Sequence, residues 1–298
     1  MNLLITGAWP DAKSHIEEIE ALGHTVVFLQ QEADALPCEP DWVEGVICNG
    51  LLLHHPIDQF PNLRFIQLTS AGVDRVDMHY VQAHNIEFHN ARGVYSIPMA
   101  EFAVCGVLQL YKQSRFFYEN QKAHKWEKHR SLLELYGKTV TILGCGSVGT
   151  ECAKRFKAFG CRVLGVDLYP REDKAYEEIF PLSKLEETLP KTDILILTVP
   201  LTPETTYIMN RCRLSMLPST AVVVNISRGK VLDELALCDL LQKENLAGAV
   251  LDVFEYEPLL EADSLWNTIK LIVTPHNSFV SENNAERLST LVINNLVS

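Results

Sequence analysis

The 298-residue sequence contains no apolar run that approaches the roughly 20 residues needed to span a bilayer. Its N-terminus, Met1–Gly7, lacks the basic region and the small-residue cleavage motif of a secretory signal peptide. Positive charge is also scarce, since 26 Lys and Arg stand against 38 Asp and Glu and give a formal net charge of −12. Nucleic acids and anionic membranes bind basic faces, so neither is expected as a partner.

The eight cysteines lack the spacing of a metal site or of a redox pair. None forms a CxxC pair and no Cys/His cluster has zinc spacing, so no metal site is predicted. Scattered thiols without a disulfide framework are typical of a reducing compartment. We therefore expect eight reduced cysteines and a cytoplasmic protein.

What the sequence does contain is a series of short apolar segments separated by helical patterns. Hydrophobic residues make up 47% of the chain, whose length suits two domains. The strands expected in the first part are 2–6, 25–29, 45–48, 64–68 and 86–88. Those expected in the second are 139–143, 162–166, 194–198, 221–226, 248–251 and 271–274. Strands that alternate with helices pair in parallel, so the sequence predicts an α/β protein of two lobes joined by a long helix near 99–115.

A glycine-rich turn follows the predicted strand Thr139–Leu143. Gly144, Gly146 and Gly149 form a GxGxxG pattern before a segment with helical spacing. In a dinucleotide site the first glycine permits a tight turn, the second lets the pyrophosphate approach the backbone, and the third lets helix and strand pack closely. The phosphates then meet N–H groups at a helix N-terminus.

An acidic residue, Asp167, ends the next predicted strand, 18 residues after Gly149. A carboxylate at this distance accepts hydrogen bonds from the adenosine ribose of a dinucleotide. Asp167 would repel a 2′-phosphate, so NAD is the expected cofactor. Arg171 lies close enough in sequence to keep NADP as an alternative.

Three polar side chains follow the later predicted strands. Arg228 follows 221–226, Glu257 lies in the segment after 248–251, and His276 follows 271–274. Open α/β sheets bind ligands at the carboxyl ends of their strands, and a carbonyl-reducing site needs a cation, a proton donor and a group that tunes the donor. Each residue also has an ordinary structural explanation, and the pattern alone does not select His276 among ten histidines.

Together these residues resemble the D-isomer-specific 2-hydroxyacid dehydrogenase family over nearly the whole chain. The likeness rests on Thr141–Asp167, Leu195–Leu217, Val224–Leu237, Asp252-Val253-Phe254, Glu257-Pro258 and Thr274-Pro275-His276. The resemblance implies that His276 exchanges a proton with the oxygen of the substrate and that Glu257 hydrogen-bonds the imidazole and favours its charged form. It also implies that Arg228 bridges the carbonyl and carboxylate of the substrate.

The resemblance implies an architecture of two doubly wound parallel-sheet lobes. A Rossmann dinucleotide lobe at 99–276 is inserted in a flavodoxin-like substrate-binding lobe formed by 1–98 and 277–298. The implied substrate-binding residues are Ser70, Ala71, Gly72 and Arg228. The implied cofactor-binding residues are Gly144, Gly146, Ser147, Val148, Gly149, Asp167, Val199, Pro200, Thr205, Ile226, Ser227, Asp252 and His276. A segment after Glu101 and one containing Trp126 resemble the family's dimerisation arm, so a homodimer is expected.

The chain departs from the family pattern at two positions. Phe279 stands where small residues are usual and leaves the size of the pocket open, while Cys145 replaces the usual Leu and is expected to be a small apolar filler. The expected reaction is the NAD-dependent interconversion of a small D-2-hydroxy acid and its 2-oxoacid, with the particular acid undetermined. A phosphoglycerate-type dehydrogenase and a non-catalytic NAD-sensing binding protein are the alternatives.

Overall fold

The computed structural model describes residues 1–297 and divides the chain into two compact units. Unit 1 comprises Met1–Tyr95 and the C-terminal segment from Ser281, whereas unit 2 is the continuous stretch Ser96–Val280. Unit 2 is therefore an insertion in the sequence of unit 1. The predicted lobe boundaries lie within a few residues of these. Within residues 1–297 no helix combines the length and the apolarity needed to cross a membrane.

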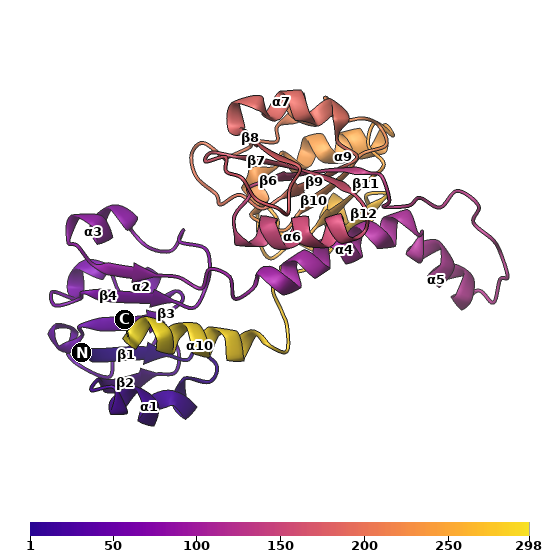
Figure 1. Cartoon of the computed structure of the whole chain (residues 1–298). Helices are drawn as coiled ribbons and strands as arrows, with labels where there is room; N and C mark the ends of the chain where they lie inside the picture. The colour runs from indigo at the N-terminus through magenta and orange to yellow at the C-terminus, as the bar shows by residue number, and fades with distance from the viewer. Residues whose placement is uncertain (298) are drawn as a thin grey trace. The chain divides into compact units, whose positions relative to one another are not determined.

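Unit 1 is built on a five-stranded parallel sheet (Figure 1). Its strands are β1 (Asn2–Thr6), β2 (Thr25–Leu29), β3 (Gly45–Cys48), β4 (Phe65–Leu68) and β5 (Glu87–His89). They are arranged in the flavodoxin-like order β2-β1-β3-β4-β5, with Leu4 of β1 opposite Val27 of β2 and Val46 of β3. The predicted parallel α/β fold of this lobe is confirmed.

Helices cover both faces of the sheet in unit 1. The helices are α1 (Ile16–Ala21), α2 (Leu51–His54), α3 (Met78–Ala83) and α10 (Asn284–Val297). Because successive side chains of a strand point to opposite faces, Leu3 and Ile5 pack with α1 and α10 while Leu4 packs with α2 and α3. Trp9 fastens α10 by donating from its indole nitrogen to the hydroxyl of Ser289 at 3.0 Å. The C-terminal helix thus completes the core of the lobe in which the chain begins.

Unit 2 is built on a seven-stranded parallel sheet. Its strands are β6 (Thr139–Leu143), β7 (Arg162–Asp167), β8 (Glu178–Pro181), β9 (Ile194–Leu197), β10 (Val222–Asn225), β11 (Gly248–Leu251) and β12 (Leu271–Val273). Their order, β12-β11-β10-β9-β6-β7-β8, reverses between β6 and β9. This is the Rossmann arrangement, in which ligands bind at the carboxyl ends of the strands beside the reversal.

The sequence predicted six strands in this sheet, and the seventh, β8, was missed. It is a four-residue edge strand whose only buried member is Ile179, and it ends at Pro181. A short edge strand that is partly exposed lacks the continuous apolar run by which the central strands are recognised.

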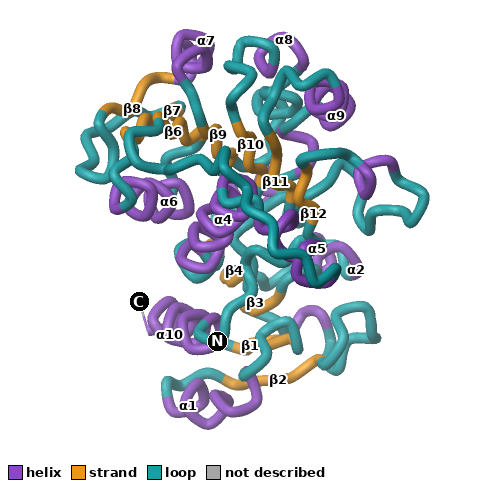
Figure 2. Tube along the Cα trace, turned by 90° about the vertical axis from the view of Figure 1, so that its right-hand side faces the viewer, coloured by secondary structure: helices purple, strands orange, loops and turns teal. Residues whose placement is uncertain are grey.

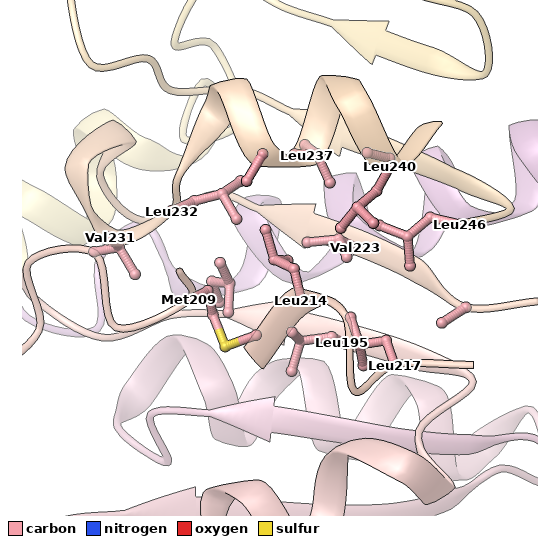
Figure 3. Packing of buried hydrophobic residues seen from close by; sticks show 14 of the residues in the cluster. Leu195, Met209, Leu214, Leu217, Val223, Val231, Leu232, Leu237, Leu240 and Leu246 are labelled. Atoms are coloured by element: carbon pink, nitrogen blue, oxygen red, sulfur yellow. The ribbon is translucent and has the colours of Figure 1, made fainter. Parts of the chain in front are cut away.

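Helices cover both faces of the sheet in unit 2 (Figures 1 and 2). The helices of this unit are α4 (Ser96–Tyr111), α5 (Ser114–Lys122), α6 (Ser147–Ala158), α7 (Leu185–Thr188), α8 (Arg211–Leu214) and α9 (Glu234–Gln242), of which α5 has no buried residue and belongs to neither layer. α4 and α6 pack on one face, and α7, α8 and α9 on the other, where Leu195 and Val223 of the sheet meet Leu237 and Leu240 of α9 (Figure 3). The helix predicted at 99–115 is two helices, because Gln113 adopts a left-handed conformation with φ +52° between them.

Candidate active site

The glycine-rich turn joins β6 to α6 beside the reversal in strand order. Gly144 has φ +98°, and a Cβ there would lie 2.8 Å from the backbone nitrogen of Val199. A Cβ on Gly149 would lie 2.0 Å from the carbonyl oxygen of Gly144. By contrast, no atom lies within 4 Å of the position of a Cβ on Gly146. Two of the glycines therefore serve the packing of the chain, and Gly146 leaves the turn open to a ligand.

The start of α6 fits the pyrophosphate of a dinucleotide. Gly146 is the N-cap of this helix, and no side chain of the described residues caps it. The first turn, which begins with Ser147 and Val148, contains no acidic residue. Backbone N–H groups and the positive end of the helix dipole favour an anion at such a terminus.

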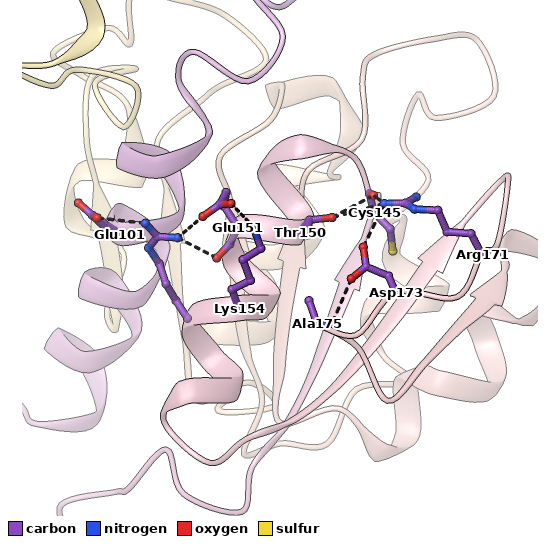
Figure 4. A network of polar contacts seen from close by, with 9 residues as sticks. Glu101, Cys145, Thr150, Glu151, Lys154, Arg171, Asp173 and Ala175 are labelled. Carbon is purple, nitrogen blue, oxygen red and sulfur yellow. Dashed lines mark hydrogen bonds and ion pairs between the residues drawn. The ribbon is translucent and has the colours of Figure 1, made fainter. Parts of the chain in front are cut away.

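Two side chains of opposite charge border the glycine turn. Asp167 at the end of β7 accepts hydrogen bonds from the backbone nitrogens of Cys145 at 2.7 Å and Tyr169 at 2.9 Å. Arg171 donates to the carbonyl oxygen of Cys145 at 2.6 Å and pairs with Asp173 at 3.5 Å (Figure 4). The residue expected to select NAD and the residue that favours NADP thus contact the same peptide segment.

Cys145 lies inside this turn and is fully buried. A Cβ on Gly165 of β7 would lie 2.5 Å from the Cys145 sulfur, so the two small residues share one space. Burial raises the pKa of the Cys145 thiol to about 12. Because a reactive cysteine needs an accessible thiolate, the prediction of a small apolar filler is confirmed.

The turn after β10 carries Arg228 and is organised by Asn225. The buried amide oxygen of Asn225 accepts from the backbone nitrogen of Ser227 at 3.1 Å and from its hydroxyl at 2.9 Å, and its Nδ2 donates to the carbonyl oxygen of Arg228 at 3.0 Å. Asn225 was not among the predicted site residues. The sequence could have drawn attention to Asn225, because it is the one polar residue in the otherwise apolar run Ala221–Ile226.

Gly229 brings the Arg228 turn against the segment that carries Glu257. A Cβ on Gly229 would lie only 1.9 Å from the carbonyl carbon of Phe254 and 2.3 Å from the nitrogen of Glu255. Any other residue would push the two segments apart. The Arg-Gly pair of the sequence therefore has a steric basis, because the glycine fixes where the arginine backbone lies.

Glu257 and His276 form a hydrogen-bonded pair. Nδ1 of His276 and Oε2 of Glu257 are 2.8 Å apart, and Oε1 of Glu257 accepts from the backbone nitrogen of Phe254 at 2.9 Å. The His276 side chain is 40% exposed. Since Glu257 engages Nδ1, Nε2 is the ring nitrogen that can exchange a proton with a ligand.

Asp252 holds the loop that carries His276. Its carboxylate is fully buried and accepts from the hydroxyl of Thr274 at 2.7 Å and from the backbone nitrogens of Asn277 at 2.8 Å and Ser278 at 2.9 Å. The family resemblance implied that Asp252 is a cofactor-binding residue. In this structure its carboxylate hydrogen-bonds the loop around His276, and this supporting role was not predicted from the sequence.

The remaining predicted residues lie in loops after the strands of each unit. In unit 2, Val199, Pro200, Thr205, Ile226 and Ser227 follow β9 and β10, and the Thr205 hydroxyl donates to the carbonyl oxygen of Pro200 at 2.6 Å. In unit 1, Ser70, Ala71 and Gly72 follow β4. The Ser70 hydroxyl donates to the carbonyl oxygen of Gly72 at 3.2 Å, and the Asn90 side chain donates to that of Ala71 at 2.7 Å. Unit 2 therefore carries Arg228, Glu257 and His276, and unit 1 carries 70–72.

A Rossmann sheet, an open glycine turn and a His–Glu pair beyond the strand ends are the features of a dinucleotide-binding oxidoreductase. Residues 104–278 match the family model described as D-isomer specific 2-hydroxyacid dehydrogenase, NAD binding domain. The chain belongs to the D-isomer-specific 2-hydroxyacid dehydrogenase family, as its sequence motifs predicted.

Similar proteins include named enzymes and solved structures. A glyoxylate reductase of Korarchaeum cryptofilum is 33% identical over 263 residues, which cover 84% of this chain and 79% of that protein. The structure of a D-lactate dehydrogenase of Aquifex aeolicus with NAD and lactic acid has a TM-score of 0.80 and 25% identity. That of a D-isomer specific 2-hydroxyacid dehydrogenase of Xanthobacter autotrophicus with NADPH and MES has a TM-score of 0.81 and 27% identity. Each alignment covers 99% of this chain and 94% of the other.

Proposed function

We propose that the protein is an NAD-dependent enzyme that interconverts a small D-2-hydroxy acid and its 2-oxoacid. The observation that carries the proposal is the 2.8 Å bond between Nδ1 of His276 and Oε2 of Glu257. A carboxylate on one side of an imidazole fixes the orientation of the ring and favours the imidazolium form, which can donate a proton from the other side.

The proposed reaction divides between cofactor and protein. When bound, the nicotinamide supplies a hydride to the carbonyl carbon of the 2-oxoacid, or accepts one from the hydroxy acid. His276 gives a proton from Nε2 to the carbonyl oxygen during reduction and takes it back during oxidation, while Glu257 stabilises its charged form. Arg228 orients the substrate through its carbonyl and carboxylate oxygens, for which a planar guanidinium is well suited. In unit 1 the backbone amides of Ser70, Ala71 and Gly72 are the proposed ligands of the carboxylate.

NAD is the proposed cofactor because Asp167 presents a negative charge where the adenosine ribose is expected. Both carboxylate oxygens already accept one backbone hydrogen bond, yet each has a further acceptor site for a ribose hydroxyl. Pyrophosphate binding is assigned to the open side of Gly146 and the amides of Ser147 and Val148. Arg171 supports NADP as the second candidate, since its guanidinium contacts the same turn.

A homodimer is proposed from an apolar groove and exposed aromatic side chains in unit 2. The groove, about 470 Å³ in volume, runs along α4 and α6 and includes Val104, Leu108 and Phe159 in its lining. In the segment after α5, Trp126 is 98% exposed and Tyr136 is 79% exposed. Surfaces of this kind mark protein–protein contacts. The eight free thiols agree with the proposed cytoplasmic location.

The experiment that tests the function is a panel of 2-oxoacids assayed with NADH and NADPH in parallel. Glyoxylate, hydroxypyruvate, pyruvate and branched 2-oxoacids sample side chains of increasing size. We expect turnover of at least one small member with NADH. Inactivity across the panel with both cofactors would contradict the proposal, and turnover with NADPH alone would reverse the cofactor assignment. Light scattering of the wild type and of Trp126→Ala tests the dimer.

A further inference from the structure

A carboxylate that the proposed reaction does not use lies behind the His276–Glu257 pair. Glu234 is the first residue of α9, whose N-cap Asp233 accepts from the backbone nitrogen of Ala236 at 2.9 Å and so fixes the start of the helix. The half-buried side chain of Glu234 turns onto the segment after β11. There its Oε1 accepts from the backbone nitrogen of Glu255 at 2.7 Å.

This contact places two carboxylates on consecutive backbone amides. The amide of Phe254 donates to Glu257 at 2.9 Å, and the next amide, of Glu255, donates to Glu234. Gly229, in the turn that carries Arg228, packs against the peptide unit between Phe254 and Glu255. The segment that carries Glu257 is therefore held by two hydrogen bonds. Glu257 itself accepts from the amide of Phe254, and Glu234 accepts from the amide of Glu255.

The groups that face Glu234 come from three elements, and the carboxylates among them make its surroundings negative. Glu255 and Glu257 lie on the segment after β11, Asp263 is the N-cap of η7 (Ser264–Asn267), and the Cys238 thiol lies one turn further along α9. Burial, followed by the charges of Glu255, Asp263 and Glu257, raises the pKa of Glu234 to about 7, although the hydrogen bond from the Glu255 amide opposes this. Glu234 consequently changes charge within the pH range in which dehydrogenases are assayed.

We propose that Glu234 is a positioning residue for the His276–Glu257 pair, because its hydrogen bond with the Glu255 amide fixes the segment that carries Glu257. The inference rests on the proposed function, because it assigns His276 the role of proton donor. Glu234 acts through Glu257 and does not itself contact the substrate.

Two substitutions test the positioning role. Glu234→Gln keeps an oxygen that can accept from the Glu255 amide, whereas Glu234→Ala removes it. For Glu234→Gln we expect kcat within about threefold of the wild type, because the hydrogen bond is retained. For Glu234→Ala we expect a loss of kcat of about tenfold with a smaller change in KM. Glu187→Gln, the same change at an exposed position of α7, is the control and should match the wild type.

A second readout does not require turnover. The ring nitrogen signals of His276, assigned by their loss in His276→Gln, are compared by NMR at one pH in the wild type, in Glu234→Gln and in Glu234→Ala. We expect the signals to move in Glu234→Ala and to keep their positions in Glu234→Gln. Unmoved signals together with wild-type kcat in a folded Glu234→Ala would overturn the positioning role. If the wild type turns over no 2-oxoacid but the signals move in Glu234→Ala, the proposed function fails and the positioning role stands.

Discussion

The backbone nitrogen of His276 donates to the carbonyl oxygen of Asp252 at 2.8 Å, while the carboxylate of the same aspartate binds the two backbone nitrogens that follow the histidine. His276 has φ +51°, a left-handed conformation that costs a residue with a side chain about 1–3 kcal/mol. The bonds to Asp252 on both sides of the histidine offset this cost. The orientation of His276, which follows β12, thus depends on Asp252, a buried residue at the end of the neighbouring strand β11.

We expect Asp252→Asn to lower both stability and turnover. The substitution replaces an acceptor oxygen by an amide that faces backbone N–H groups, and a buried donor left without an acceptor costs about 1–3 kcal/mol. Urea unfolding should show a loss of about 2–4 kcal/mol, and kcat should fall more than KM rises. An unfolding midpoint equal to that of the wild type would show that the carboxylate does not hold the loop.

His276→Ala should reduce kcat by about 10²–10⁴-fold, the range that a positioned general acid contributes. NADH binding, measured by fluorescence titration, should change much less. Glu257→Gln is the matched second variant, because it keeps the shape of the partner and removes its charge, and we expect a smaller loss of kcat. Normal turnover by His276→Ala would exclude it as the acid/base.

Two alanine substitutions in the glycine turn should have opposite signatures. A Cβ on Gly146 meets nothing within 4 Å, so Gly146→Ala should retain wild-type stability and lose affinity for the dinucleotide. A Cβ on Gly149 would lie 2.0 Å from a backbone oxygen, so Gly149→Ala should lose about 2–4 kcal/mol of stability even without cofactor. Thermal unfolding with and without NADH measures both. Equal stabilities of the two variants would contradict the division of roles.

Much of the fold could be predicted from the sequence because its strands are continuous apolar runs buried on both faces. β10 and β11 are examples, each four residues long and buried throughout. The edge strand β8 escaped prediction because its burial is partial. The bond between His276 and Glu257 spans 19 positions and the carboxylate contacts of Asp252 span 22 to 26, so neither is visible in local patterns. The family motifs pointed to these residues and to the bond between Glu257 and His276, but not to the support that Asp252 gives to the loop.

Phe279 should limit the size of the substrate. Its ring stands edge-on to the imidazole of His276, with centroids 6.0 Å apart. If His276 is the proton donor, the substituent on the carbon that receives hydride is expected near this ring, and a phenyl group there should favour glyoxylate over branched 2-oxoacids. We expect Phe279→Ala to raise kcat/KM for a branched 2-oxoacid relative to glyoxylate by about 10-fold or more. Phe279→Leu should lie between, and an unchanged ranking in both variants would remove Phe279 from the specificity determinants.

Glu234→Gln should stabilise the protein at alkaline pH. The raised pKa of Glu234, about 7 against an ordinary 4.5, means that folding favours the neutral carboxyl, so its contribution is full below about pH 4.5 and is lost as the pH rises through 7. Glutamine is neutral at every pH. The melting temperatures of variant and wild type should therefore converge towards acidic pH, with the variant about 2 °C or more higher at pH 8. A constant difference at all pH values would indicate that the effect is not one of ionisation.

The return of α10 to the first sheet has a consequence for how the protein is made. On the ribosome the whole of unit 2, Ser96–Val280, is synthesised before α10. All five strands of the unit 1 sheet have been made once β5 is synthesised, but α10, which packs on Leu3 and Ile5, is not yet present. An uncovered apolar sheet face is prone to association with other chains. During synthesis the first lobe therefore has an apolar sheet face that α1 covers only in part, and this face is the part of unit 1 most prone to such association until α10 is made.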